Sequence, residues 1–311
     1  PRMSVKLTIL LFIFLMISFF MDVIITYVNG LDPVWREEYS RALNIPALDK
    51  RFRDWGTLRY LLRGVETFMP FVRNVHLVVS GKTQVPEWAS DRLKVVTHRD
   101  IIPEEFLPTF NSTTIEMFLH RIPELDERFI YFNDDMFPVS PCREEDFFRD
   151  GKIVIGFSTH LLATGMYKRQ CRNSDRLARK ALGLGHTPFF IRPQHICSPM
   201  FRSACEEVYT KMRKEIFSTV SQVRTMDNLN QYLFLDYMYH KGKAIRERLS
   251  GKFFSIATSS ASSIGEYLRN PSRKLVCIND VHLKDEAYVS ERRILLASFD
   301  AALPKKSVYE K

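Results

Sequence analysis

The sequence predicts an α/β protein with a mostly parallel sheet and a helix-rich inserted lobe. Short runs of β-branched and aromatic residues alternate with segments that have helical apolar spacing, and this alternation is typical of parallel sheets. Several runs end abruptly in clusters of Asn, Asp and Gly, as strands do when they enter turns. The length of 311 residues suits one such core with an added lobe.

The first half of the chain supplies three expected strands and one long helix. Residues 23–28 (VIITYV) form a β-branched run that stops at Asn29 and Gly30, which predicts a buried first strand. Apolar residues recur at helical spacing over residues 54–69, and Pro70 ends that helix. Residues 75–79 and 93–97 read as two further buried strands.

The second half continues the alternation and adds a helix-rich middle with clustered prolines. The expected elements are a short helix at 115–122, strands at 129–132 and 153–157, helices between about 171 and 242, a strand at 274–278 and a closing helix at 286–302. These elements predict one domain over residues 21–311. It consists of a first half at 21–160, a helical lobe at 161–245 and a return to the core at 246–311.

The N-terminal segment allows two interpretations. Lys6 precedes an apolar run of fourteen residues at 7–20, whereas a spanning helix needs about 20 residues. No small-residue cleavage site separates this run from MDVIITYVNG, as a signal peptide would require. Residues 1–20 are either a leader that contacts the inner face of the plasma membrane or an upstream extension that precedes a start at Met21.

Charge and cysteine usage limit the partners and the compartment. The chain has 45 basic and 36 acidic residues, a net charge of +9, which suits an anionic partner. The basic residues are scattered and no helix-turn-helix or zinc-finger signature is present, so we expect no nucleic-acid partner. The five cysteines are far apart and form no C-x-x-C pair, which indicates reduced thiols in a cytoplasmic protein.

The strongest candidate for chemistry is the acid pair that follows the strand at 129–132. Asn133, Asp134 and Asp135 end this strand, and two adjacent carboxylates repel each other unless a cation lies between them. Such pairs hold Mg²⁺ or Mn²⁺ against a diphosphate. The alternative is a solvated turn, in which Asn and Asp are common.

Glu116 has two explanations. Thr113 and Glu116 have the spacing of a capping box, in which the carboxylate folds back onto the start of the helix. His120 lies four residues further on, so the two side chains would share a helix face and form part of a site. Asn111 precedes this helix and is a candidate for substrate binding.

Further polar residues follow the first strand and open the first long helix. Asn29 and Asp32 lie beyond the carboxyl end of the strand, where open α/β sheets bind ligands. Arg53 and Arg59 flank the helix start, a natural place for phosphate. The competing interpretation of the two arginines is a solvated basic face.

Four residues further along the chain are unremarkable by pattern alone. His186 lies in a loop between Gly and Pro, and such histidines are usually only exposed. Arg224 follows Val223, and Asn279 and Asp280 end the strand at 274–278.

Long motifs resemble those of the Stealth family of capsular and exopolysaccharide phosphotransferases. The resemblance to the first two conserved regions of that family lies in the segments DVIITYVNGLDP, RDWGTLRYLLRGVETFMPFVRNVHLVVSG and LPTFNSTTIEMFLHRIPELDERFIYFNDDMF. The third region is resembled more loosely by GHTPFFIRP with SQVRTMDNLNQYLFLDYMYH, and the fourth by KLVCINDVH. The matches run in family order from Asp22 to about His282. Tyr27 stands where the first motif commonly has Trp.

The family is similar in turn to the Golgi enzyme that adds N-acetylglucosamine-1-phosphate to lysosomal glycoproteins. The resemblance implies a Rossmann-like nucleotide-sugar fold, a UDP-N-acetylhexosamine-type donor and a divalent metal, Mg²⁺ or Mn²⁺. The implied catalytic residues are Glu116, Asp135, His186 and Arg224. The implied metal ligands are Asp134, Asp135, Asn279 and Asp280. The residues expected to bind substrate are Asn29, Asp32, Arg53, Arg59, Asn111, His120 and Asn133. The inserted modules of the eukaryotic relatives are absent, so recognition of lysosomal proteins is not implied.

The function that follows is transfer of hexose(amine)-1-phosphate from a UDP-sugar to a hydroxyl of a growing polysaccharide or lipid-linked oligosaccharide, with release of UMP. The alternative is a metal-dependent glycosyltransferase that moves the sugar alone and releases UDP. In that scheme His186 and Arg224 have no required place. A third class is a sugar-nucleotide-binding or polymer-binding protein of the same fold without turnover.

Overall fold

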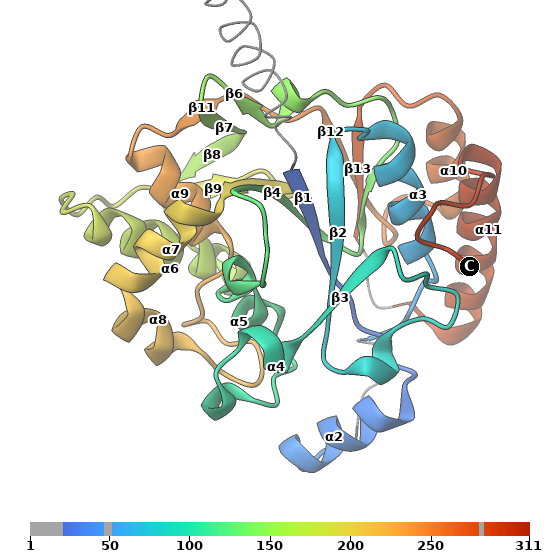
Figure 1. Ribbon diagram of the computed structural model, residues 1–311, viewed down its shortest axis with the longest axis horizontal. Helices are drawn as coiled ribbons and strands as arrows, with labels where there is room; N and C mark the ends of the chain where they lie inside the picture. Colours follow the sequence, from blue (N-terminus) through green and yellow to red (C-terminus); the bar gives the residue numbers. More distant parts are fainter. Residues whose placement is uncertain (1–20, 47–51, 280–282) are drawn as a thin grey trace, which may run out of the picture.

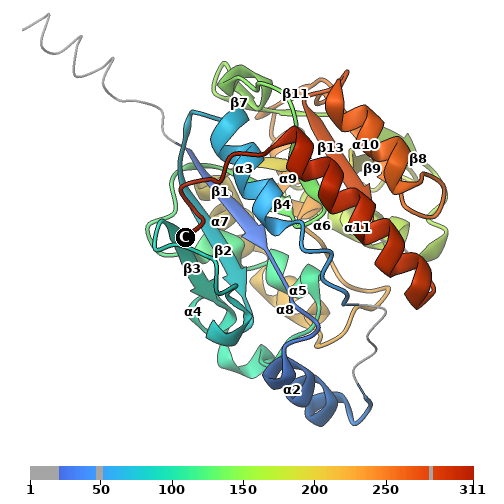
Figure 2. The same cartoon turned by 90° about the vertical axis from the view of Figure 1, so that its right-hand side faces the viewer.

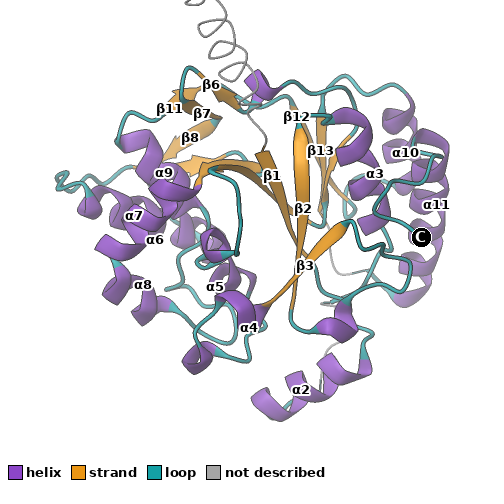
Figure 3. Cartoon of the chain, viewed as in Figure 1, coloured by secondary structure: helices purple, strands orange, loops and turns teal. Residues whose placement is uncertain are grey.

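The computed structural model describes residues 21–46, 52–279 and 283–311. A central sheet lies between two groups of helices (Figures 1 and 3), which confirms the α/β class. The strands are β1 Met21–Thr26, β2 Val72–Val79, β3 Leu93–Thr97, β4 Arg128–Asn133, β5 Met136–Pro138, β6 Phe148–Arg149, β7 Lys152–Ile155, β8 Phe157–His160, β9 Phe190–Pro193, β10 Ser198–Phe201, β11 Ala244–Arg246, β12 Gly251–Ser255 and β13 Leu275–Asn279. The helices are α2 Pro33–Leu43, α3 Leu58–Phe68, α4 His98–Ile101, α5 Ser112–Glu116, α6 Gly165–Ala181, α7 Arg202–Lys211, α8 Arg213–Thr219, α9 Tyr232–His240, α10 Ala261–Arg269 and α11 Asp285–Ala302.

The order of the strands in the central sheet is β10-β4-β1-β2-β3. The first four strands of the chain pair in parallel, and β10 adds to β4 in the antiparallel direction. Read from the other edge, the order 3-2-1-4 is that of one half of a doubly wound Rossmann sheet. The chain runs from β1 outward to β3 and then returns to β4 on the other side of β1, so the topological switch point lies between β1 and β4.

Two expected strands form, but outside the central sheet. The strand predicted at 153–157 is divided into β7, which pairs with β6 and β11, and β8, which pairs with β9. The strand predicted at 274–278 is β13, which pairs with β12 and β5 in a three-stranded sheet. The mostly parallel central sheet is confirmed, and these two strands lie outside it because a run of apolar residues predicts a strand but not its partner.

The proline-rich middle also holds more strand than expected. Two short strands, β9 and β10, lie between α6 and α7, where only loop and helix were predicted. Pro199 is accommodated in β10 because this strand forms an edge of the central sheet. Helix α2, which begins at Pro33, was not predicted at all. The proposed boundaries at 160 and 245 stay predictions.

One face of the sheet is covered by α3 and α11, which lie side by side (Figure 2). The rings of Tyr60 and Phe299 stack between these two helices, with centroids 5.1 Å apart. One turn further along the same face, α3 approaches β5 closely: a side chain at Gly64 would come within 2.4 Å of the carbonyl oxygen of Pro138. This close approach places β5 and its partner β13 next to the switch point.

All five cysteines are free and buried, as expected for reduced thiols. None of the described helices has both the length and the apolar composition needed to cross a bilayer. The apolar run at 7–20 lies outside the described residues.

A buried ion pair fastens the last residues of the chain to α3. Arg63 donates from Nε and Nη2 to both carboxylate oxygens of Glu310, at 2.8 and 2.9 Å, and from Nη1 to the carbonyl oxygen of Leu303 at 2.8 Å. Both side chains of the pair are at most 5% exposed. The guanidinium group would be left buried without its main partner if Glu310 were removed.

We therefore expect Glu310→Ala to lower the free energy of unfolding by about 3 kcal/mol, because it strands a buried charge. The control is Glu37→Ala, which removes the partner of Arg41 in a pair whose side chains are 71% and 74% exposed. This control should cost less than about 1 kcal/mol. Urea unfolding of both variants checks the difference, and equal stabilities would contradict the role of the buried pair.

Candidate active site at the switch point

The carboxyl ends of β1 and β4 meet at the first cavity. Thr26 at the end of β1 lies opposite Asn133 at the end of β4. The hydroxyl of Tyr131 donates to Oδ1 of Asn133 at 2.6 Å and lies 2.9 Å from the hydroxyl of Thr26, so it fixes the Asn133 side chain. A cavity of about 460 Å³ opens beyond these ends and is lined by Tyr27, Asn133 and Asp134 among others. Open α/β sheets bind ligands at such a position.

The pairing of β5 with β13 brings Asn279 to the same place as the acid pair. The backbone N–H of Ile278 donates to the carbonyl oxygen of Asp135 at 2.8 Å, just before the antiparallel ladder begins. Asn279 follows at the end of β13 and lines the same cavity as Asp134 and Asp135. Asp135 and Asn279, 144 residues apart in the sequence, thus line one cavity. Asp280 lies outside the described residues.

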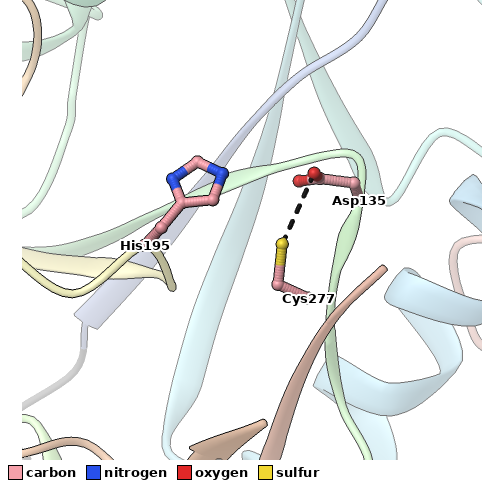
Figure 4. A group of neighbouring side chains, drawn as sticks. All are labelled: Asp135, His195 and Cys277. Carbon is pink, nitrogen blue, oxygen red and sulfur yellow. Dashed lines mark hydrogen bonds between the residues drawn. The ribbon is translucent and has the colours of Figure 1, made fainter. Parts of the chain in front are cut away.

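Asp135, His195 and Cys277 form a compact group at this place (Figure 4). One potential ligand atom from each lies within 4.8 Å of the other two. The Cys277 thiol is 3.5 Å from Oδ2 of Asp135, to which it donates. Burial first, and Asp135 next, raise the pKa of this thiol, so it stays protonated. Burial lowers the pKa of His195, although the charge of Asp135 opposes this shift. The lowered pKa favours the neutral imidazole.

This site has groups that fit a divalent cation. The carboxylates of Asp134 and Asp135 and the side-chain oxygen of Asn279 line one cavity, and oxygen ligands are those that Mg²⁺ and Mn²⁺ prefer. The concentrated negative charge is also evident from its neighbour Tyr27: its pKa is raised by burial first, then by Asp54 and by Asp134. A set of Asp135, His195 and Cys277 alone would suit a softer ion such as Zn²⁺.

Glu116 points toward the site rather than back onto its own helix. The helix α5 is capped by Asn111, whose side chain accepts from the N–H of Thr113, so the expected capping box of Thr113 and Glu116 is wrong. Glu116 is 4% exposed and accepts from the backbone N–H of Gln231 at 2.9 Å. Burial raises its pKa to about 7, although the N–H of Gln231 and the charge of Arg224 oppose this shift.

Glu116 and His120 do not share a helix face, because α5 ends at Glu116 and a separate 3₁₀ turn, Leu119–Arg121, carries His120. His120 is buried against the rings of Tyr209 and Phe234. Burial, followed by the nearby arginines Arg121 and Arg202, lowers its pKa to about 3.

A second cavity of about 700 Å³ adjoins the first. Glu116 lines this second cavity only, whereas Asp134 and Asp135 line the first only. The residues that line both cavities are Ser112, Asn133, His195, Arg224 and Asn279. Arg224 is held at this junction by a hydrogen bond to the hydroxyl of Ser112. Two ligands, one in each cavity, would meet at these five residues.

The residues expected around the first strand and helix have structural partners. Asp32 caps α2 and accepts from Thr83 and Gln84, both at 2.7 Å. Arg53 pairs with Asp285 and lines the first cavity. Asn29, Asp32 and Arg59 line a third cavity, about 730 Å³ in volume, next to the first. Their proposed roles in substrate binding stay predictions.

Three expected site residues lie away from the cavities, and two other residues were missed. His186 is exposed in the loop between α6 and β9, and Asn111 is buried in hydrogen bonds to Thr114 and Asn228. None of the three cavities is lined by His186, Asn111 or His120. His195 and Cys277 were overlooked. The available signal was that His195 lies two residues after the segment FFIRP and that Cys277 lies two residues before Asn279.

Similarity to known proteins identifies the family. Residues 51–155, which carry Glu116 and the acid pair, match the model of Stealth protein CR2, conserved region 2. The capsular polysaccharide phosphotransferase fcs1 of Haemophilus influenzae is 33% identical over 288 residues, which cover 83% of this chain and 78% of that protein. The chain belongs to the Stealth family. As a member of this family of phosphotransferases, it is a transferase enzyme.

Other relatives of this Stealth protein extend over most of its length. The capsular polysaccharide phosphotransferase WcwK of Streptococcus pneumoniae is 29% identical and covers 93% of this chain and 98% of the relative. The capsular polysaccharide phosphotransferase cps1A of Actinobacillus pleuropneumoniae is 31% identical, and the match covers 84% of this chain and 79% of that relative. Among solved structures, galactosyltransferase LgtC in complex with donor and acceptor sugar analogs matches at 9% identity and a TM-score of 0.42, over 93% of this chain and 98% of that one. That likeness is too weak to carry a conclusion.

The raised pKa of Glu116 predicts a pH-dependent stability. Below its ordinary value of 4.5 the carboxyl is neutral in both the folded and the unfolded chain. As the pH rises toward 7, the unfolded chain ionises first and the folded state loses its advantage. The free energy of unfolding of the wild type should therefore fall by about 3 kcal/mol relative to Glu116→Gln between pH 4.5 and pH 8.

Urea unfolding at pH 4.5 and pH 8 measures this divergence. Glu145→Gln, on the exposed surface, is the matched control. Curves for wild type and Glu116→Gln that stay parallel across this range would show that the carboxyl is not buried in solution.

Proposed function

We propose that this Stealth protein transfers hexose(amine)-1-phosphate from a UDP-N-acetylhexosamine-type donor to a hydroxyl of a growing capsular or exopolysaccharide, free or lipid-linked, and releases UMP. The observation that carries this proposal is the meeting of two cavities at Ser112, Asn133, His195, Arg224 and Asn279. A transfer between two large substrates needs such a junction, and the names of the relatives indicate phosphotransfer to a capsular polysaccharide.

The first cavity suits the donor. It lies at the switch point of the sheet, where nucleotides bind in this class of fold, and it contains the acid pair. Asp134, Asp135 and Asn279 would hold Mg²⁺ or Mn²⁺, which when bound would neutralise the charge of the diphosphate. Arg224, at the junction, would contact the phosphoryl oxygens directly.

The step we propose is attack of an acceptor hydroxyl on the β-phosphorus, the one bonded to the sugar. A new oxygen–phosphorus bond forms, the bond to UMP breaks, and the anomeric carbon–oxygen bond stays intact. His195 is placed at the junction and faces Asp135, so we assign it, rather than the distant His186, to accept the proton of the hydroxyl. Its Nδ1 lies 3.3 Å from the hydroxyl of Tyr232, which orients the ring. We further propose that the enzyme acts in the cytoplasm, at the inner face of the plasma membrane.

Substitution of residues at the junction or in either adjoining cavity should remove turnover and leave folding intact. We expect His195→Gln to lower kcat by about 10²–10⁴-fold because the proton acceptor is lost. Arg224→Ala should lower it by about 10²–10³-fold because charge on the phosphoryl group is no longer stabilised. Asp135→Asn and Glu116→Gln should also lose most turnover. His186→Gln is the control and should keep near-normal activity, so a loss equal to that of His195→Gln would contradict the assignment.

Analysis of the leaving group separates this function from sugar transfer. The protein is incubated with a panel of UDP-sugars, Mg²⁺ and an oligosaccharide primer, and the nucleotide product is separated by chromatography. UMP, together with a phosphodiester signal in the phosphorus NMR spectrum of the product, is the expected outcome. UDP would instead show a glycosyltransferase, and binding of a UDP-sugar without any product would show a binding protein.

A further inference from the structure

The second cavity has walls from parts of the chain that lie outside the central sheet. Its lining includes residues of β8, β9 and α6 and of the segment that runs from β11 into β12. His195 and Arg224 connect it to the first cavity. If the donor occupies the first cavity, the acceptor must reach the junction through the second, so the chemistry of these walls describes the acceptor.

The charge of the second cavity is strongly one-sided. Arg192, Arg224, Arg248 and Lys252 line it, and among the described residues that line it only Glu116 has a carboxyl group. No carboxylate of the described residues lies within salt-bridge distance of Arg192, Arg248 or Lys252, whereas several other basic residues outside the core, such as Arg149, Lys180 and Lys211, are paired. Unneutralised cations that line a concave site attract an anionic ligand.

Aromatic side chains accompany these cations. Phe253 is 51% exposed, although it lies on β12 beside the site, and its ring centroid is 6.2 Å from that of His195. Phe157 and Tyr167 also line the cavity. Flat apolar rings next to a reacting position can pack against the C–H faces of sugar rings, while the cations recognise charge between the sugars.

The wall that carries Arg248 is fixed to the loop that carries His195. The backbone N–H of Gln194 donates to the carbonyl oxygen of Gly156 at 2.7 Å. The side-chain amide of Gln194 donates to the carbonyl oxygen of Leu249 at 3.2 Å. A side chain at Gly156 would come within 2.8 Å of Cα of Arg248, so the backbone around Gly156 and the backbone around Arg248 are in close contact. The cationic wall and the junction therefore keep a fixed spacing.

We propose that the second cavity binds an acceptor that carries a phosphate group, with the phosphate against Arg192, Arg248 and Lys252 and the accepting hydroxyl at His195. This inference rests on the proposed function. The product of each transfer contains a phosphodiester. It therefore carries the phosphate group that the second cavity binds when this product becomes the next acceptor. The protein thus prefers to elongate a phosphodiester-linked chain over modifying a neutral one. The same phosphate chemistry is present in the diphosphate of a lipid carrier.

The test compares three acceptors of the same sugar and length: one with phosphodiester linkages, one with neutral glycosidic linkages, and the neutral one attached to a lipid diphosphate. For the wild type, kcat/KM should be about tenfold or more higher with a phosphorylated acceptor than with the neutral one, a usual effect of hydrogen bonds to a charged group. A higher value with the phosphodiester-linked acceptor identifies the polymer as the source of the phosphate. A higher value with the lipid-linked acceptor alone identifies the carrier and overturns the preference for elongation.

The variant Arg248→Gln/Lys252→Gln should bring this ratio close to one, mainly through KM. The matched control, Lys243→Gln/Arg269→Gln, removes the same charge from exposed residues that line none of the three cavities and should keep the wild-type ratio. Equal kcat/KM values for all three acceptors in the wild type, or equal loss of the ratio in both variants, would overturn the proposal.

Calorimetric titration with the phosphodiester-linked acceptor makes the result independent of turnover. Its binding should be weakened about tenfold by Arg248→Gln/Lys252→Gln, and UDP should not displace it, since UDP belongs in the first cavity. Displacement by UDP would place the anion in the donor cavity and overturn the proposal. If UMP never appears but this binding pattern holds, the transfer reaction fails and the anionic subsite stands.

Discussion

The site depends on the parallel pairing of β1 with β4. This pairing is the point at which the chain, having built β2 and β3 on one side of β1, continues on the other side. The loops after the two strands therefore diverge and leave an opening that the sheet itself cannot fill. Asn133, fixed by Tyr131, stands at the edge of this opening, and the acid pair follows directly.

A second constraint closes the opening from the side. The antiparallel pairing of β5 with β13 attaches the segment before Asn279 to the segment after Asp135. Because Gly64 allows α3 to approach β5, this small sheet is supported by the same helix that covers the central one. The concentration of oxygen ligands is thus a result of backbone pairing and not of the loops alone.

The sequence was sufficient for the local elements and for part of the site. The strand at Leu93–Thr97 was predicted to the residue, and the strands around 23–28 and 129–132 were found within a few residues, because continuous apolar runs mark buried strands. Glu116, Asp135, Arg224 and Asn279 do line the two adjoining cavities. The sequence does not show which strands pair with each other. Nothing in the residues of β13 indicates that this strand pairs with β12 and β5. His195 was missed for a related reason, since only the fold places it beside Asp135, and the sequence does not show that neighbour.

The two cavities have different origins in the chain. The first is formed largely by the ends of the central strands, whose positions are fixed by the parallel ladder. The second is formed largely by short strands and loops, which are held together by hydrogen bonds such as those of Gln194 to Gly156 and Leu249. Replacements in these outlying walls can alter what enters from that side without disturbing the ladder. Substitutions can therefore accumulate around the second cavity while the backbone pairing that shapes the first is kept.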